Sequence, residues 1–181
     1  MNVIPTPLAG VLILEPKVFS DARGFFQESW NERTFRDATG VSPTFVQDNH
    51  SRSSRGVLRG IHYQLVKAQG KLVRCSRGAA FDVAVDLRRS SSTFGKWTGV
   101  ELSDTNHKQM WIPEGFGHAF LVLTEIADFQ YKTTEYWIGT HDRALRWNDP
   151  AIGIEWPLTG EPILAARDSA APLLADAEVF L

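Results

Sequence analysis

The stretch Phe81-Asp82-Val83-Ala84-Val85-Asp86-Leu87-Arg88 has the clearest periodicity in the chain. In an extended backbone its four large apolar side chains fall on one face. The two aspartates, the alanine and the arginine fall on the other face. A period of two of this kind predicts a β-strand with one buried face.

Short segments of similar character lie on both sides of this strand. They are Val11–Leu14, Gly24–Ser29, Val57–His62, Lys71–Ser76, Trp97–Leu102, Gln109–Ile112, Ala119–Leu123 and Phe129–Thr134. Turn residues such as Ser90-Ser91-Ser92 and Pro113-Glu114-Gly115 separate them. Many short strands at close spacing predict a β-sandwich or a barrel, so the fold class we expect is mainly β.

Helical periodicity is scarce in this sequence. One helix is expected between Asn31, which can cap its start, and Gly40, which can end it. The Ala- and Pro-rich tail predicts a short helix near Ala171–Ala177. The sequence has no internal repeat, linker or low-complexity segment, so we expect a single domain spanning residues 1–181.

Composition limits the classes of partner. The chain has 181 residues and a net charge of -2. A phosphate backbone requires a basic surface, so we expect no nucleic-acid partner, although two or three arginines are enough for one nucleotide. Met1–Pro5 lacks a signal-peptide pattern, and no apolar stretch approaches the ~20 residues that cross a bilayer. We therefore expect no membrane partner and a cytoplasmic location.

The single cysteine, Cys75, cannot form an intramolecular disulfide. Its neighbours predict a strand, so we interpret it as a small core residue rather than a nucleophile.

The densest polar cluster, Gln47–Gly56, leads directly into Val57–Gln64. If the second segment is a strand, Arg59 faces one side and His62 the other, and Gly60 leaves space beside His62 for a ligand. Two interpretations stay open at this point. The cluster is either a polar loop before an ordinary strand or part of a ligand site.

A second cluster, Pro113–His118, places a histidine on a tight turn before an apolar run, which predicts an imidazole at a barrel mouth. Double-stranded β-helix proteins (cupins) often bind a metal through such a segment and a His-x-His pair. Here His62-Tyr63-Gln64 supplies one imidazole and an amide, and Gln is a poor metal ligand. We therefore expect a barrel without a metal, and a metal-dependent cupin dioxygenase or isomerase remains a different class of function.

The residues that remain are typical of an acid–base site. His62 can act as a base near neutral pH. Tyr131 can supply a proton, and Lys71 can supply positive charge to an oxyanion. Tyr131 and Lys71 could equally be packing or surface residues.

Five segments together match a known family. They are Asp21–Glu28, Gln47–Ser51, Gly56–Gln64, Asp82–Arg88 and Trp147–Pro150. From Gly10 to about Asp168 the sequence resembles the dTDP-4-dehydrorhamnose 3,5-epimerase family. The resemblance implies a homodimer of cupin-like double-stranded β-helix (jelly-roll) barrels with a few short helices, no metal and no cofactor.

The resemblance also implies roles for individual residues. His62 is the base, oriented by Asp168; Tyr131 is the proton donor; Lys71 stabilises an enolate. The substrate-binding residues that it implies are Arg23 and Glu28, contributed to the site of the neighbouring subunit, and Gln47, Asp48, Asn49, Arg59, His118, Trp137, Asp142 and Arg167.

The reaction implied is inversion at C3 and C5 of dTDP-4-keto-6-deoxy-D-glucose, which gives dTDP-4-keto-L-rhamnose. The chain departs from the common pattern at Trp137, where Tyr is frequent, at Asp142, where Glu is usual, and at Arg167, where Lys is common. These positions surround the nucleotide rather than the acid and base. An epimerase that inverts only one carbon and a non-catalytic sugar-nucleotide-binding barrel are the other interpretations.

Overall fold

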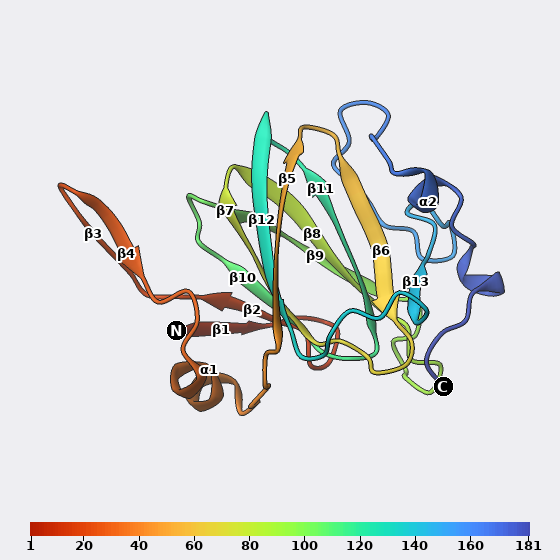
Figure 1. Ribbon diagram of the computed structural model, residues 1–181, viewed down its shortest axis with the longest axis horizontal. Helices are drawn as coiled ribbons and strands as arrows, with labels where there is room; N and C mark the ends of the chain where they lie inside the picture. Colours follow the sequence, from red (N-terminus) through yellow and green to blue (C-terminus); the bar gives the residue numbers. More distant parts are fainter.

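The computed structural model describes residues 1–181 and is built mainly of short strands (Figure 1). The strands are β1 (Asn2–Pro5), β2 (Leu12–Glu15), β3 (Val18–Asp21), β4 (Gly24–Gln27), β5 (Gln47–Ser54), β6 (Leu58–Gln64), β7 (Lys71–Arg77), β8 (Ala79–Asp86), β9 (Trp97–Ser103), β10 (Gln109–Ile112), β11 (Phe116–Val122), β12 (Ile126–Thr133) and β13 (Asp142–Ala144). The helices are α1 (Glu32–Thr39), α2 (Ala166–Ser169) and a 3-10 helix at Leu174–Asp176. None of the helices has the length and apolar character that a membrane span requires.

Two antiparallel sheets face each other and enclose the interior. One has the strand order β1-β2-β10-β7-β12-β5, and the other has the order β13-β6-β11-β8-β9. Figure 1 shows the two sheets curving around a common interior, with β5 and β6 joined by a short turn at one end of the barrel. This is a cupin-like jelly-roll barrel, so the predicted fold class is confirmed.

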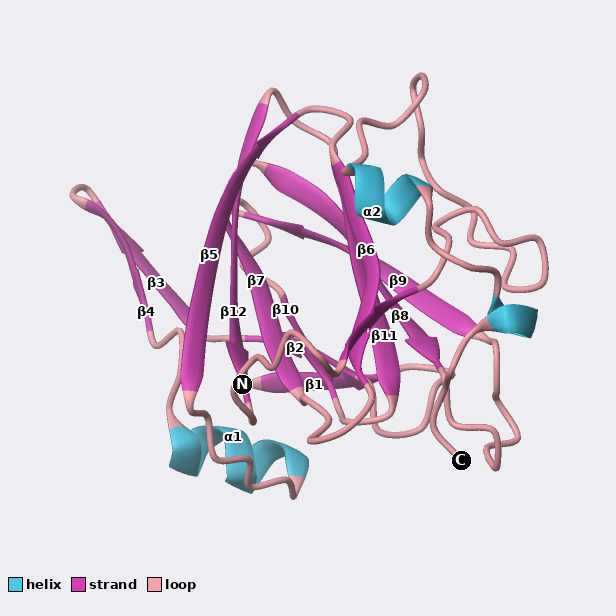
Figure 2. Cartoon of the chain, turned by 45° about the vertical axis from the view of Figure 1, so that its right-hand side comes forward, coloured by secondary structure: helices cyan, strands magenta, loops and turns pink.

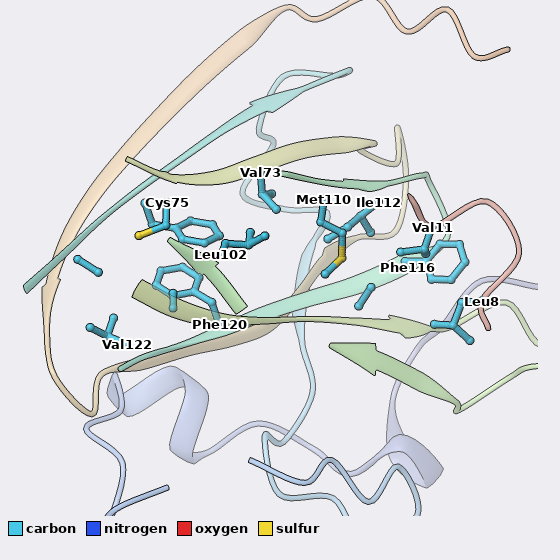
Figure 3. Close-up of a cluster of buried hydrophobic side chains, with 14 residues drawn as sticks. Leu8, Val11, Val73, Cys75, Leu102, Met110, Ile112, Phe116, Phe120 and Val122 are labelled. Atoms are coloured by element: carbon cyan, nitrogen blue, oxygen red, sulfur yellow. The ribbon is translucent and has the colours of Figure 1, made fainter. Parts of the chain in front are cut away.

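Three apolar clusters stabilise the barrel. The largest contains 14 buried residues between the two sheets, among them Val73, Phe120 and Cys75 (Figure 3). Cys75 is therefore the core residue that we expected, and burial raises the pKa of its thiol to about 11. A second cluster lies between the five-stranded sheet and the C-terminal segment. A third packs Phe35 of α1 against the six-stranded sheet; Figure 2 shows α1 at the end of the barrel.

The strand predicted over Phe81–Arg88 overlaps β8, which starts at Ala79 and ends at Asp86. The prediction of one buried face was wrong. Asp82 and Asp86 are both completely buried. The Val83 face packs against the C-terminal segment, which runs outside the sheet. The Asp82 face is therefore turned into the barrel, where it can contribute to a site.

Two polar or tail segments also differ from expectation. The run Gln47–Ser54 is a regular strand, β5, so the loop interpretation was wrong. It pairs with β12 along its whole length, and side chains on one of its faces line the barrel. The tail contains a 3-10 helix at Leu174–Asp176, within the range predicted for a helix, and a second short helix, α2, which was not predicted.

The predicted helix after Asn31 is confirmed as α1. The Asn31 Oδ1 accepts a hydrogen bond from the Thr34 N–H at 3.0 Å, and Gly40 ends the helix with φ 73°. The expected Gly24–Ser29 strand is present as β4, but it does not join the barrel. It pairs with β3 in a hairpin that projects away from both sheets (Figure 1).

Candidate active site

A short polar contact joins His62 on β6 to Asp168 on α2. The His62 Nε2 and Asp168 Oδ1 atoms are 2.6 Å apart, and the Gly60 N–H donates to Asp168 Oδ2 at 3.3 Å. Burial acts to raise the pKa of Asp168, but the hydrogen bond and charge of His62 outweigh it, so this pKa lies below its ordinary value. The carboxylate therefore stays charged and holds the imidazole in one orientation.

A cavity of about 270 Å³ lies beside this pair. Its lining residues come from both sheets and from the loop after β12: Asn49, His50, Ser51, Arg59, His62, Tyr63, Gln69, Lys71, His118, Phe120, Tyr131, Trp137 and Asp142. His62 is on the five-stranded sheet, whereas Lys71 and Tyr131 are on the six-stranded sheet. The candidate base and the candidate acid thus stand on opposite walls.

Lys71 is a buried cation with no ion-pair partner. Its side chain is on β7, and its Nζ lies 5.9 Å from the centre of the Tyr131 ring. Burial lowers the pKa of Lys71 to about 8, although the charges of Asp142 and Asp82 oppose this shift. An ammonium that has lost its hydration is well suited to an anionic oxygen in the cavity.

Tyr131 packs against the interior core and keeps one side toward the cavity. Burial raises the pKa of its phenol, and the charge of Asp142 raises it further. The phenol is therefore protonated over the working range of pH, as a proton donor must be.

His118 is not at the barrel mouth, contrary to the prediction. It is the third residue of β11 and lies directly opposite His62 in the sheet. Its Nε2 is 2.6 Å from the Asp82 Oδ1, and both side chains are buried. Burial lowers the pKa of His118 and raises the pKa of Asp82.

Sequence reasoning missed Asp82, because we placed it on an exposed face. Its other oxygen, Oδ2, has no hydrogen-bond partner. The available signal was an aspartate in a strand that is mostly apolar, since a buried carboxylate usually has a specific partner.

The prediction that side chains alternate between the two faces of β6 was also wrong. Arg59 and His62 were expected on opposite faces, yet both line the cavity. The pairing of β6 with β11 shifts between His118 and Phe120, which turns the chain locally. Arg59 is held by the Ser53 hydroxyl, which accepts from its Nε at 3.1 Å and from its Nη2 at 3.0 Å.

The expectation that Gly60 leaves space for a ligand beside His62 was wrong. A Cβ at this position would lie 2.5 Å from the Ala119 Cβ and 2.6 Å from the His118 carbonyl oxygen. Its φ of +118° also disfavours any other residue. Glycine is needed here because β6 and β11 approach each other closely.

Trp137 stands at the rim of the cavity, with 60% of its surface exposed. Its backbone N–H donates to the Gln47 Oε1 at 3.1 Å, and its indole Nε1–H donates to the Asp142 Oδ2 at 3.1 Å. The Gln47 Nε2 donates in turn to the Asn49 Oδ1 at 3.0 Å. Arg167, which precedes Asp168, also donates to Asp142, so these predicted binding residues form one connected group.

Gln64 has a role that sequence reasoning missed. It is buried, donates to the Lys67 and Tyr136 carbonyl oxygens, and accepts from the Ile138 N–H at 2.8 Å. The amide that replaces the second histidine of a metal-binding His-x-His pair therefore fixes the loop that carries Trp137. No group of three or more His, Cys, Asp or Glu side chains is arranged to hold a metal ion.

Five of the predicted binding residues do not line the cavity. Gln47 and Arg167 are hydrogen-bonded to residues that do line it, whereas the other three lie further away. Arg23 is on the projecting hairpin and pairs with Asp21, and Glu28 follows the same hairpin and accepts from Asn31. Asp48 points to the outer face of the six-stranded sheet, where Lys132 pairs with it at 2.9 Å. Within one chain, these side chains do not reach the His62 site.

Fold and site together define a class: a cupin-like barrel whose interior cavity is lined by imidazole, ammonium and phenol groups. A model of the dTDP-4-dehydrorhamnose 3,5-epimerase family matches residues 5–176. The chain belongs to this family.

Individual relatives agree with this assignment. The chain is 57% identical to the dTDP-4-dehydrorhamnose 3,5-epimerase of Pseudomonas aeruginosa over 180 residues, which is 99% of each protein. It is also 57% identical to the epimerase of Salmonella typhimurium, over 98% of this chain and 97% of the relative.

Solved structures are similar as well. The dTDP-6-deoxy-D-glucose-3,5-epimerase of Legionella pneumophila, in complex with dTDP-4-keto-L-rhamnose, superposes with a TM-score of 0.95 at 47% identity, covering 98% of this chain and 94% of that chain. A 3'-monoepimerase from Streptomyces bikiniensis, in complex with dTDP-quinovose, has a TM-score of 0.90 at 38% identity, covering 97% and 88%.

Proposed function

We propose that this enzyme inverts C3 and C5 of dTDP-4-keto-6-deoxy-D-glucose to give dTDP-4-keto-L-rhamnose, in the biosynthesis of dTDP-L-rhamnose. The observation that carries the mechanism is the placement of His62 and Tyr131 on opposite walls of one cavity. Two relatives that are 57% identical to this chain are 3,5-epimerases, which favours inversion of both carbons over inversion of one.

The first step is proton removal beside the ketone. The C4 carbonyl acidifies the C–H bonds at C3 and C5. The His62 Nε2 is occupied by Asp168, so Nδ1 is the nitrogen that takes the proton. The C–H electron pair then forms the C=C bond of an enolate, and the negative charge moves to the C4 oxygen.

Lys71 stabilises this enolate. With its pKa near 8 the ammonium is charged at neutral pH, and burial strengthens its attraction for the C4 oxygen. Donors aimed at a developing oxyanion are typically worth about 100- to 1,000-fold in rate.

The second step delivers a proton to the other face of the same carbon. Tyr131 is on the opposite wall from His62, so its hydroxyl can protonate the enolate with inversion. Solvent then takes the proton from His62 and returns one to Tyr131, and repetition at the second carbon completes the reaction. All steps are proton transfers, so the proposal includes no redox cofactor and no metal.

A direct test is conversion of dTDP-4-keto-6-deoxy-D-glucose by protein that has been dialysed against a chelator. We expect full activity, and we expect the proton couplings of the product in NMR to show inversion at both C3 and C5. Inversion at one carbon alone would favour a single-carbon epimerase. Activity that disappears with the chelator and returns with one metal ion would favour the metal-dependent class.

We further propose that the enzyme is a homodimer in which hairpins are exchanged. The β3–β4 hairpin projects from the barrel and exposes Phe19, Phe25 and Phe26. Exposed apolar side chains on an isolated hairpin indicate a surface that another chain covers. Arg23 and Glu28 would then reach the site of the neighbouring subunit, where the Arg23 guanidinium can pair with a diphosphate.

Mixing two inactive variants tests this arrangement. In a dimer of one Arg23→Ala chain and one His62→Ala chain, the first chain keeps its own His62 and receives Arg23 from its neighbour. We expect mixed dimers to regain activity that neither variant has alone, once subunit exchange has been verified. If verified mixed dimers stay inactive, each site is built from one chain. A cytoplasmic location remains a prediction.

A further inference from the structure

One carboxylate oxygen connects the two ends of the site. The Asp142 Oδ2 accepts a hydrogen bond from the Trp137 Nε1 at 3.1 Å and another from the Arg167 Nη1 at 2.6 Å. The Asp142 side chain is only 14% exposed, whereas Trp137 is largely exposed. The largely buried Asp142 carboxylate therefore holds the exposed Trp137 ring.

The two partners of Asp142 serve different parts of the reaction. The family resemblance implies that Trp137 is the aromatic residue that stacks on the thymine base of the substrate. Arg167 is on α2, directly before Asp168, which orients His62. Asp142 itself is on β13 and pairs with Gln64 of β6, two residues after His62.

We propose that Asp142 is a positioning residue that acts through Trp137 and Arg167. It fixes the indole ring as a preformed surface for the base, and it fixes α2 next to the His62–Asp168 pair. This inference rests on the proposed function, because it requires that the Trp137 ring binds thymine and that His62 transfers a proton. A surface that is ordered before binding loses less entropy when the ligand arrives.

The backbone of the Trp137 loop is held independently of Asp142. Gln47 accepts from the Trp137 N–H, and Gln64 accepts from the Ile138 N–H. Loss of the carboxylate should therefore release the ring without releasing the loop. This separation makes Asp142 accessible to mutation without loss of the fold.

The charge of Asp142 also reaches the acid–base groups. Burial acts to raise the pKa of Asp142, but its hydrogen bonds with Arg167 and Trp137 outweigh it and lower the pKa, so the group stays ionised. Burial lowers the pKa of Lys71, and Asp142 and then Asp82 oppose that shift. Neutralising Asp142 alone should thus lower the pKa of Lys71 further, while Asp82 remains.

The experiment measures dTDP affinity by titration calorimetry in the full-length protein and in three variants: Trp137→Phe, Asp142→Asn and the double variant. Trp137→Phe removes the indole N–H and keeps an aromatic ring. A hydrogen bond of this kind contributes about 1 kcal/mol, so we expect dTDP affinity to fall about 3- to 10-fold. We expect a comparable fall for Asp142→Asn, and a double variant no weaker than the weaker single variant.

A second readout separates positioning from general structural damage. We expect Asp142→Asn to move the alkaline limb of the kcat profile to lower pH, because Lys71 loses its proton earlier, and Asp142→Glu to restore it. Effects on dTDP affinity that multiply in the double variant, or an alkaline limb that does not move, would overturn the positioning role. Wild-type protein that fails to bind dTDP would instead overturn the proposed function.

Discussion

Replacing His62 with alanine is expected to remove deuterium incorporation at both C3 and C5 of the substrate. Among the imidazoles that line the cavity, only His62 contacts the Asp168 carboxylate. The His62 Nε2 and Asp168 Oδ1 atoms are 2.6 Å apart. General acid–base catalysis typically contributes about 100- to 10,000-fold, and we expect a loss in that range. Affinity for dTDP should change little, because the catalytic base His62 contacts the sugar and not the nucleotide. The measurement is proton NMR in deuterated water, together with dTDP titration.

Two comparison variants make this result specific. Asp168→Asn keeps the size of the side chain but loses the charge that orients the imidazole, so we expect a smaller loss and a shifted pH profile. His118→Ala removes the neighbouring imidazole, which is paired with Asp82 instead. A loss of only a few-fold in His62→Ala, with a complete loss in His118→Ala, would move the base to His118.

Replacing Tyr131 with phenylalanine is expected to reduce inverted product strongly, within the same range of about 100- to 10,000-fold. The ring remains, so its packing against the interior core and its cation–π contact with Lys71 are preserved. Only the hydroxyl on the wall opposite His62 is lost. Water can replace the phenol weakly, so a small residual inversion rate is expected. The measurement is the rate of product formation by NMR, with folding checked by thermal unfolding.

The barrel could be predicted from the sequence because its strands are short and locally patterned. The alternation over Phe81–Arg88 and the turns around it reflect the period of a strand, which needs no knowledge of the rest of the chain. The same is true of the helix from Asn31 to Gly40, since capping is local. His62, Lys71 and Tyr131 could be named as candidates because an imidazole, an ammonium and a phenol are suited to proton transfer. The structure places all three on one cavity, and their roles stay predictions.

The features that were missed depend on contacts between distant segments. The interior position of Asp82 requires that the C-terminal segment cover the other face of β8. Arg59 and His62 line the same cavity because the pairing of β6 with β11 shifts register between them. The loop contacts of Gln64 join residues more than seventy positions apart in sequence, such as Ile138. None of these can be deduced from local periodicity.

The central claim is that a base and an acid act from opposite walls of the cavity, and the ratio of exchange to inversion in Tyr131→Phe tests it most directly. Exchange needs only His62 and an enolate stabilised by Lys71, whereas inversion also needs the Tyr131 hydroxyl. In deuterated water we predict that the variant keeps exchanging deuterium into substrate of unchanged configuration. Inversion should fall by a much larger factor than exchange, at C3 and C5 measured separately. Equal losses of exchange and inversion, or no loss of either, would contradict the account.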